Sequence, residues 1–167
     1  MKKQFDSLVA ELRSKNGVKR KRARNALVKI RKPSVPFLID LMTDPNDHVR
    51  WEACKALLNI KDLTAAIPST VALSDENSDV RWLAAEALIA IKKEAIIPLL
   101  QTLEENFDSP EVRQGAHHVL NALAKQNLLN QDTIAIIDKL DFPEPYSSVV
   151  CAVQKALSSI GMTGEKL

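Results

Sequence analysis

Glycine and aromatic residues are scarce in this chain. Its 167 residues include four glycines, and aromatic residues make up 4% of them. A β-sandwich or β-barrel needs many turn glycines and aromatic cross-strand pairs, so both architectures are excluded. With 46% apolar and 26% charged residues the chain can build a core, which excludes the disordered and collagen-like classes. The composition therefore predicts an all-α fold.

Cysteine is also rare, and long apolar runs are missing. Cys54 and Cys151 belong to no CxxC motif or Cys/His cluster, so we expect neither a disulfide framework nor a zinc site, but two reduced, half-buried thiols. No apolar run approaches the roughly 18 residues that cross a bilayer, and Met1-Lys2-Lys3 leads into a mixed amphipathic segment unlike a signal peptide. We therefore expect a cytoplasmic protein that does not contact a membrane.

An internal repeat of about thirty residues dominates the middle of the chain. A Val-Arg pair begins each clear copy, and apolar residues follow at offsets 4, 7, 8 and 11 from the valine. The clear copies are Val49-Arg50, Ala53, Ala56-Leu57, Ile60; Val80-Arg81, Ala84, Ala87-Leu88, Ile91; and Val112-Arg113, Ala116, Val119-Leu120, Leu123. Degenerate copies are Lys19-Arg20, Ala23, Ala26-Leu27, Ile30 and Val149, Val153, Ala156-Leu157, Ile160. Stacked repeats of this length serve binding more often than chemistry.

Each copy predicts one amphipathic helix. At 100° per residue the apolar offsets fall within about 80° of one another, which makes a narrow buried stripe. The alanines at offsets 4 and 7 would let a neighbouring helix approach closely. A loop with capping residues, such as Asp44-Pro45-Asn46-Asp47, precedes each helix. A second apolar stretch follows each helix, so the repeat unit is a helical hairpin; these stretches are residues 35–42, 65–73, 95–103 and 134–140.

The pattern indicates one domain, residues 1–167. We expect residues 1–16 to form an N-terminal capping helix and residues 17–140 to form the repeats. The last interval is longer, and Asp141-Phe142-Pro143-Glu144-Pro145 must interrupt any helix there. Residues 141–167 are therefore expected to form an irregular C-terminal capping repeat.

The central repeats resemble a known family. The string Asp44, Val49-Arg50, Ala53, Ala56-Leu57, Ile60, Ile67-Pro68, Leu73, with its near copy from Asp75 to Leu103, is similar to the HEAT-like repeats of the phycobilisome-lyase type. The resemblance covers residues 17–140. It implies a right-handed α-solenoid of five or so HEAT-like helical hairpins, with first helices on the convex side and second helices on the concave side. It also implies a structural ladder in which the arginines Arg20, Arg50, Arg81 and Arg113 pair with acidic loop residues such as Asp44, Asp75 or Asp108.

The chain departs from the family pattern in places. Bulky Val28, Leu58 and Ile89 stand at offset 9, where family members often carry a small residue. Ser69 and Thr70 replace two apolar residues expected in the second helix of their repeat. A lyase activity is not carried over, because the repeat has no catalytic residues and the chain is shorter than expected of a complete bilin lyase subunit.

On the second helices, eight positions opposite the core recur at the repeat period, and the two in each helix are four residues apart. We expect them to line the concave groove: Pro36, Ile67, Ile97 and Ile134 in one row, and Asp40, Val71, Gln101 and Asp138 in the other. An apolar floor with polar flanks suits a peptide or an amphipathic helix. The alternative is that curvature or the next repeat covers these isoleucines.

On the first helices, two tryptophans recur at offset 2, about 170° from the buried stripe. Trp51 and Trp82 are followed seven residues later by Leu58 and Ile89, which completes a convex aromatic patch. Burial of such a ring against a partner or a second copy can be worth up to roughly 5 kcal/mol, so a homodimer through the two tryptophans is possible. The alternative is that each ring packs over the aliphatic stem of a neighbouring arginine, such as Arg50 or Arg81.

Charge is uneven along the chain. Residues 1–42 hold 12 Lys and Arg against 3 Asp and Glu, while the remainder holds 11 against 18. Phosphate backbones, anionic lipid heads or an acidic protein would all be attracted to the first repeat. The alternatives are a solvated charged face and an electrostatic match to the acidic later repeats. The basic patch comprises Lys19, Arg20, Lys21, Arg22, Arg24, Arg31 and Lys32.

Groupings suited to catalysis are poor. His117 and His118 are adjacent and point about 100° apart on a helix, which does not suit joint metal ligation. No Gly-rich phosphate loop or Ser/Cys/His arrangement is present. We expect no catalytic, cofactor or metal site, and interpret the chain as a non-enzymatic scaffold or adaptor that binds a protein or peptide through its concave surface. The alternatives are nucleic-acid binding through the basic first repeat and a role as an accessory subunit of a lyase-type enzyme.

Overall fold

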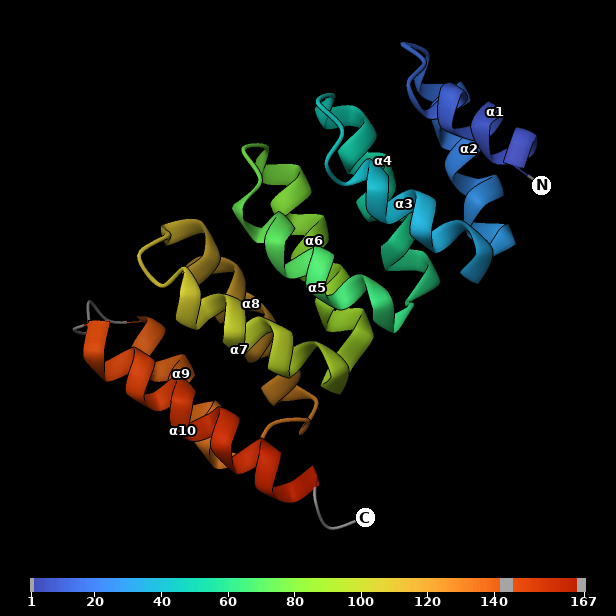
Figure 1. Ribbon diagram of the computed structural model, residues 1–167. Helices are drawn as coiled ribbons and strands as arrows, with labels where there is room; N and C mark the ends of the chain where they lie inside the picture. Colours follow the sequence, from blue (N-terminus) through green and yellow to red (C-terminus); the bar gives the residue numbers. More distant parts are fainter. Residues whose placement is uncertain (1, 142–145, 165–167) are drawn as a thin grey trace. The chain divides into compact units, whose positions relative to one another are not determined.

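The computed structural model of the chain describes residues 2–141 and 146–164, and over these ranges it contains helices and no strand (Figure 1). The all-α prediction is confirmed. The chain divides into two compact units, Met1–Ile91 and Lys92–Leu167. A single domain over residues 1–167 stays a prediction.

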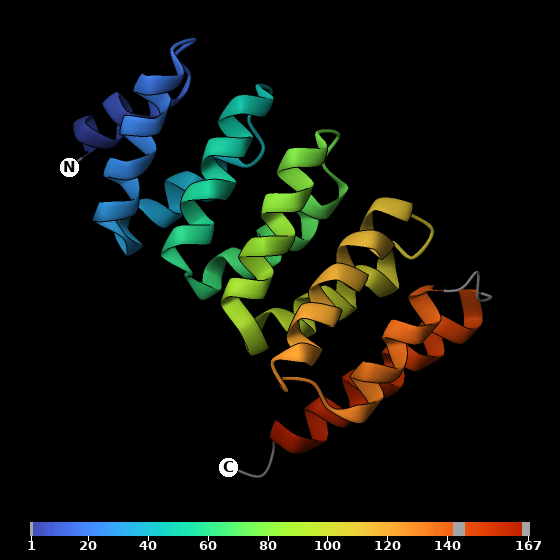
Figure 2. The same ribbon diagram turned by 180° about the vertical axis from the view of Figure 1, so that it is seen from behind.

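The first unit arranges its helices in two layers. One layer contains α1 (Lys2–Leu12), α3 (Val35–Leu41) and α5 (Ala66–Val71), and the other contains α2 (Gly17–Ile30), α4 (Asp47–Ile60) and α6 (Ser78–Ile91) (Figures 1 and 2). Helix α4 packs between α2 and α6, while α1, α3 and α5 pack against α2, α4 and α6, respectively. Short 3₁₀ turns η1 (Lys32–Ser34), η2 (Leu63–Ala65) and η3 (Ala72–Ser74) lie before α3, before α5 and after α5.

The second unit begins with a 3₁₀ turn and ends with a helix pair in reversed order. It contains η4 (Lys92–Ala95), α7 (Ile96–Glu105), α8 (Pro110–Lys125), α9 (Gln131–Asp141) and α10 (Tyr146–Gly164). Helix α9 packs beside α8, and α10 packs beside α7, as both views show. The sequence predicts the opposite, with residues 134–140 as a second helix and the copy at Val149 as a first helix.

The connection after α8 accounts for this reversal. Residues 128–130 lie outside any helix or turn, whereas 3₁₀ turns link α2 to α3, α4 to α5 and α6 to α7. This connection without a 3₁₀ turn leads into α9 in the layer of α8 instead of crossing to the layer of α7. The predicted break at Asp141–Pro145 falls largely on residues 142–145, which lie outside the described residues.

The predicted helix starts are confirmed. Asn16, Asn46 and Asn77 precede α2, α4 and α6, and the side-chain oxygen of each accepts a backbone N–H two residues ahead at 2.9–3.0 Å. The hydroxyl of Ser109 accepts the N–H of Val112 at 3.3 Å before α8. These bonds satisfy first-turn amides that have no partner within the helix.

Helices α4, α6 and α8 are each followed by a residue with a positive φ angle. The φ angle is 59° at Lys61, 69° at Lys92 and 57° at Asn127, which follow α4, α6 and α8. Glycine is the usual residue in this conformation, because a Cβ atom is strained there. The positive charge of each lysine compensates in part, since it lies at the negative end of the helix dipole.

The predicted buried stripe forms the core. Its residues on α4, α6 and α8 are at most 5% exposed, apart from Ile60, which is half-buried. The stripe alanines of these helices are at most 2% exposed, as close helix packing requires. Helix α2 departs from the pattern, because Ala26 and Ile30 are half-buried and Lys19 is exposed.

Candidate binding surfaces

Three large apolar side chains are exposed along η2 and α5. Leu63, Ile67 and Val71 are 55%, 66% and 65% exposed, respectively. Ile67 and Val71 are four residues apart on α5 and lie one above the other, and Leu63 on the 3₁₀ turn η2 just before α5 adds a third exposed apolar side chain. We call these three residues the α5 ridge. The sequence predicts Ile67 and Val71 from the repeat period, but it missed Leu63, which lies before the apolar stretch that begins at residue 65.

The buried side of α5 consists of Ala66 and two polar residues. Ser69 and Thr70 are each 1% exposed. The hydroxyl of Thr70 donates to the backbone oxygen of Ile67 at 2.8 Å, whereas the hydroxyl of Ser69 has no hydrogen-bond partner. A buried hydroxyl without a partner destabilises a fold by roughly 1–3 kcal/mol. Helix α5 therefore buries polar side chains and exposes apolar ones.

Helix α7 shows the ordinary arrangement at the equivalent positions, thirty residues further on. Lys93, Ile97 and Gln101 are exposed. Ile97 is 42% exposed, which is less than any residue of the α5 ridge. Leu99 and Leu100, which correspond to the two buried polar residues of α5, are fully buried. Helix α7 therefore contributes more apolar surface to its core than α5 does.

The remaining row residues lie on α3 and α9. Pro36 and Asp40 are exposed on α3. On α9, Asp138 is exposed and Ile134 is half-buried. Because α9 lies beside α8 and not beside α7, the structure does not continue the predicted rows into the last helix pair.

A cavity of about 240 Å³ opens beside Ile97 in the second unit. It is lined by Lys93, Ile96, Ile97, Leu128, Asn130, Thr133 and Ile160. Four of these residues are apolar, and Lys93 supplies the charge. The cavity has the size and polarity to accept an apolar side chain of a partner.

The two tryptophans differ in exposure. Trp82 on α6 is 55% exposed, whereas Trp51 on α4 is half-buried. The guanidinium carbon of Arg24 lies 5.5 Å from the centre of the Trp51 ring, so the ring is covered by a cation–π contact from α2. The neighbouring arginine at Trp51 is therefore Arg24 and not Arg50. Leu58 and Ile89, which complete the predicted patch, are half-buried.

A groove of about 300 Å³ lies beside Trp51 in the first unit. It is lined by Arg20, Asp47, His48, Trp51, Glu52, Asn77 and Asp79. The amide of Asn77 donates to the Asp47 carboxylate at 2.9 Å, and this bond, followed by one from the His48 N–H, lowers the pKa of Asp47. Asp47 therefore ties the first turn of α4 to the loop before α6.

Some cations of the first repeat are paired with carboxylates. Arg13 donates two hydrogen bonds to Asp44, at 2.6 and 3.0 Å. Arg20 and Arg24 approach Glu52, which is 4% exposed, at 3.5 and 2.5 Å. These ion pairs are consistent with one alternative for the basic patch, an electrostatic match to the acidic later repeats. Arg20 accordingly does not form the ladder contact with Asp44 that the resemblance implies.

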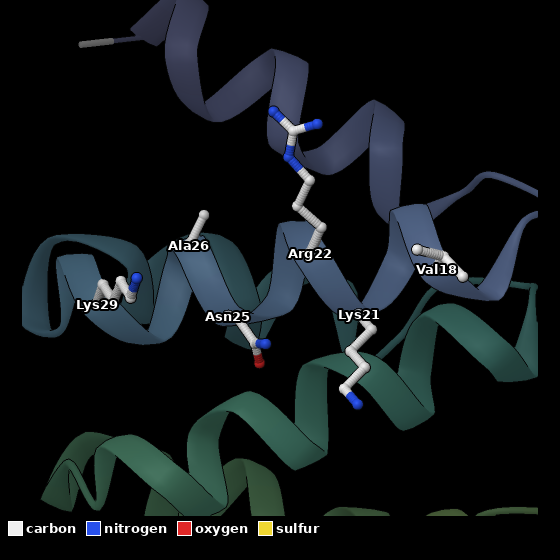
Figure 3. Close-up of a pocket in the computed structure, with 6 residues that line it drawn as sticks. All are labelled: Val18, Lys21, Arg22, Asn25, Ala26 and Lys29. Carbon is white, nitrogen blue, oxygen red and sulfur yellow. The ribbon is translucent and has the colours of Figure 1, made fainter.

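Other cations point outward. Lys19, Lys21, Arg22, Arg31 and Lys32 are exposed. On the outer side of α2 lies a groove of about 500 Å³, the basic groove (Figure 3). It is lined by Val18, Lys21, Arg22, Asn25, Ala26 and Lys29. Of these residues, the predicted basic patch contains Lys21 and Arg22.

The repeat arginines hold the loops before their own helices. The Nη1 atoms of Arg20, Arg50 and Arg81 each donate to the carbonyl oxygens five and six residues earlier, at 2.8–3.4 Å. The fixed spacing between each arginine and the loop before it could have predicted these backbone contacts, whereas the resemblance implies only pairs with acidic side chains. These contacts fix the entry of the chain into α2, α4 and α6.

The ladder implied by the resemblance is present at Arg50. This side chain donates to Asp75 through Nε at 2.7 Å and Nη2 at 2.9 Å. The hydrogen bond to Asp75 raises the pKa of Arg50 and outweighs the opposing effect of burial. At the corresponding position of α8, the guanidinium carbon of Arg113 lies 4.9 Å from the centre of the Phe107 ring, a cation–π contact.

The cysteines and histidines form no common site over the residues that the structure describes. Cys54 is 1% exposed, and burial raises the pKa of its thiol to about 12. Cys151 is exposed, so the prediction of two half-buried thiols is wrong. Between residues 2 and 164, the described part of the chain has no group of three or more His, Cys, Asp or Glu that could hold a metal ion. None of its described helices has the length and apolar character needed to cross a membrane.

Comparison with known proteins gives a family match and a set of similar folds. The family model for HEAT repeats matches residues 5–71 and 67–140. No curated protein matches the chain. A chain from the complex of CpcE and CpcF of phycocyanin lyase from Nostoc sp. PCC7120 is 22% identical, with 93% of this chain and 99% of that chain covered and a TM-score of 0.61.

Two designed proteins are similar at a lower level. An engineered protein is 23% identical over 93% of this chain and 80% of its own, with a TM-score of 0.49. A designed armadillo repeat protein in complex with a (KR)4 peptide is 19% identical over 90% of this chain and 80% of its own, with a TM-score of 0.46.

Proposed function

This chain belongs to the HEAT-repeat family, whose fold is an all-α solenoid of stacked helix pairs, and we propose that it is a non-enzymatic scaffold that binds a protein or peptide through the α5 ridge. Repeat folds of this class present extended surfaces to their partners. The similar lyase chain is described as part of a complex of two proteins, which supports a protein as the partner.

The inversion of α5 carries the proposal. Leu63, Ile67 and Val71 are more than half exposed, while Ser69 and Thr70 are buried. Folding alone favours the opposite choice, because buried apolar groups stabilise and a buried unpaired hydroxyl destabilises. An arrangement that disfavours folding is accounted for when the exposed side binds something.

The shape of the ridge indicates an apolar or amphipathic partner segment. Ile67 and Val71 lie four residues apart on one face of α5, and Leu63 lies on the turn just before it. Full burial of one such side chain is worth roughly 1.5–3 kcal/mol, so the three together can anchor a partner after the entropy of association is subtracted. An amphipathic helix laid along α5 is the binding mode that this geometry fits.

A capture experiment with matched variants tests the proposal. The immobilised full chain is incubated with a cell extract, and bound proteins are quantified by mass spectrometry for wild type, Ile67→Glu and Gln101→Glu. Both substitutions place a glutamate at an exposed position of a second helix, but only the first lies on the α5 ridge. We expect Ile67→Glu to reduce the major partner at least about tenfold and Gln101→Glu to leave it within twofold or so.

Circular dichroism melts accompany the capture, since both variants must remain folded. Equal recovery of every partner by wild type and Ile67→Glu would contradict the proposal. Loss of a partner with Gln101→Glu alone would move the binding surface to α7.

A second candidate is an accessory subunit of a lyase-type enzyme. The likeness to a chain of the CpcE–CpcF complex, which extends over 99% of that chain, is the observation that favours it. This candidate predicts that the purified protein acquires visible absorbance or a second HEAT-repeat chain when it is produced with pigment-binding partners. A colourless protein that still captures its partner through Ile67 would exclude it.

A contact between two copies of the chain through the tryptophans is a further proposal. Trp82, at 55% exposed, would make the main contribution, since Arg24 already covers part of Trp51. Sedimentation of wild type and Trp82→Ala tests it: the proposal requires a dimer that the substitution dissociates.

A further inference from the structure

The exposed side of α2 carries charge that the fold does not use. Lys21, Arg22 and Lys29 line the basic groove, and none of them has an ion pair or hydrogen bond among the described residues. The inward cations of the same segment, Arg20 and Arg24, instead both pair with Glu52. The inward arginines of α2 therefore pair with a carboxylate, whereas the cations that line the basic groove do not.

This concentration of charge opposes folding of the helix. The first turn of α2 contains no acidic residue that would complement the helix dipole. Like charges three or four residues apart, as at Lys19 and Arg22 or Lys21 and Arg24, repel one another. Their exposure on one side of the helix gives a positive potential that would attract an anionic partner.

The floor of the basic groove is apolar. Val18 is 78% exposed, more than any other large apolar residue among the described part of the chain, and Ala26 is half-buried. They are eight residues apart, about 12 Å along the helix, or slightly more than two turns. Figure 3 shows both on α2 with Arg22 between them, and with Lys21 and Asn25 on the side toward α4.

We propose that the basic groove of α2 binds an acidic amphipathic helix of a protein partner. Apolar side chains two turns apart on such a helix would cover Val18 and Ala26, and flanking carboxylates would pair with Lys21, Arg22 and Lys29. This surface is separate from the α5 ridge, so it does not depend on the function proposed for that ridge.

A nucleic acid fits the groove less well. Single strands are held by stacking on aromatic rings, but Phe5 and Phe37 stack on each other with ring centroids 4.4 Å apart, and Phe5 is 6% exposed. A phosphate backbone would gain nothing from Val18, which lies at the start of the groove. Apolar contact beside cations is what an amphipathic acidic helix requires.

Fluorescence anisotropy with three labelled peptides of about 18 residues tests this inference. The first peptide carries leucines on one helical face and glutamates beside them, the second has the same composition in scrambled order, and the third has glutamine in place of glutamate. We expect the full chain to bind the first peptide at least about tenfold more tightly than either of the others, because charge and apolar face are both needed.

Variants locate the binding. We expect Arg22→Glu and Lys29→Glu each to weaken binding of the first peptide by about tenfold, and Val18→Ser by about fivefold. Lys125→Glu, a matched charge reversal at another exposed lysine, and Ile67→Glu, on the α5 ridge, should leave it within about twofold.

Two results would overturn the inference. One is equal binding of the amphipathic and scrambled peptides, or binding of neither. The other is tighter binding of a 20-base-pair DNA duplex that falls steeply with salt and is unaffected by Val18→Ser, which would make the groove a nucleic-acid surface.

Discussion

Helices α5 and α7 occupy equivalent places in successive repeats and use their apolar residues in opposite ways. On α5 the outer positions are Leu63, Ile67 and Val71, and the inner ones include Ser69 and Thr70. On α7 the inner positions are leucines, and two of the three outer positions are polar. The equivalent helix therefore places leucines in the core in the α7 repeat, whereas in the α5 repeat it places apolar side chains on the surface.

The comparison shows how a repeat fold can carry a specific surface. Each second helix packs against the first helix that follows it, so a repeat with a weak inner face is still held by its neighbours. Positions that would destabilise an isolated hairpin become available for binding. The inference about the α5 ridge therefore rests on the polar residues that α5 buries as well as on the apolar residues that are exposed.

The largest expected effect concerns the inner face of α7. Leu99→Ala should lower the free energy of unfolding by about 3 kcal/mol, because it removes fully buried methyl groups and leaves a cavity. Urea unfolding followed by circular dichroism measures the change. A loss below about 1 kcal/mol would mean that α7 is no more important to the core than α5, and the comparison would fail.

The next effect concerns the outer face of α5. Leu63→Lys combined with Val71→Gln gives α5 the outer polarity of α7, and we expect partner capture to fall at least about tenfold while the free energy of unfolding changes by no more than about 0.5 kcal/mol. Quantitative capture and urea unfolding are measured on the same preparation. As a control, Lys93→Leu and Gln101→Val on α7 are added to this double variant, and we expect them not to restore capture. Restored capture would show that an apolar surface on either helix is sufficient.

A smaller effect concerns the inner face of α5. Ser69→Ala should raise the free energy of unfolding by about 1 kcal/mol, because it removes a buried hydroxyl that has no partner. Ser7→Ala on α1 is the control, since this serine is exposed and the substitution mainly reports helix propensity. A loss of stability in Ser69→Ala would indicate that the hydroxyl has a stabilising role.

The smallest effect concerns the residues that precede these two helices. Lys61→Gly and Lys92→Gly should each raise the free energy of unfolding by about 0.5–1 kcal/mol, because both lysines have a left-handed φ. Lys55→Gly, in the interior of α4, should lower it by a similar amount. Thermal melts compare the three, and a similar gain at Lys61 and Lys92 would confirm that α5 and α7 are entered through the same geometry.

Much of the fold could be predicted from the sequence, because its signals are local. The capping residues Asn46 and Asn77 and the stripes on α4 and α6 depend on contacts within one or two turns, and the structure has them as predicted. The order of α9 and α10 could not be predicted, since it depends on how the connection after α8 crosses between layers. The partners of Arg20 and Arg24 were missed for a similar reason, because Glu52 meets them only when α4 packs on α2.

The candidate surfaces, too, could be predicted from the sequence only in part. The repeat period alone identified Ile67 and Val71 as outer positions, because periodicity fixes which side of a helix a residue occupies. It could not tell that the inner hydroxyl of Ser69 lacks a partner, which is decided by the atoms of neighbouring helices.

By itself the sequence determined the helices, their buried stripes and the thirty-residue repeat, since each is a matter of spacing along the chain. The tertiary structure alone decided which cations pair with carboxylates, which layer the last two helices join and how exposed the α5 ridge is. The pairs join residues about thirty positions apart, and only packing brings such residues within reach of one another.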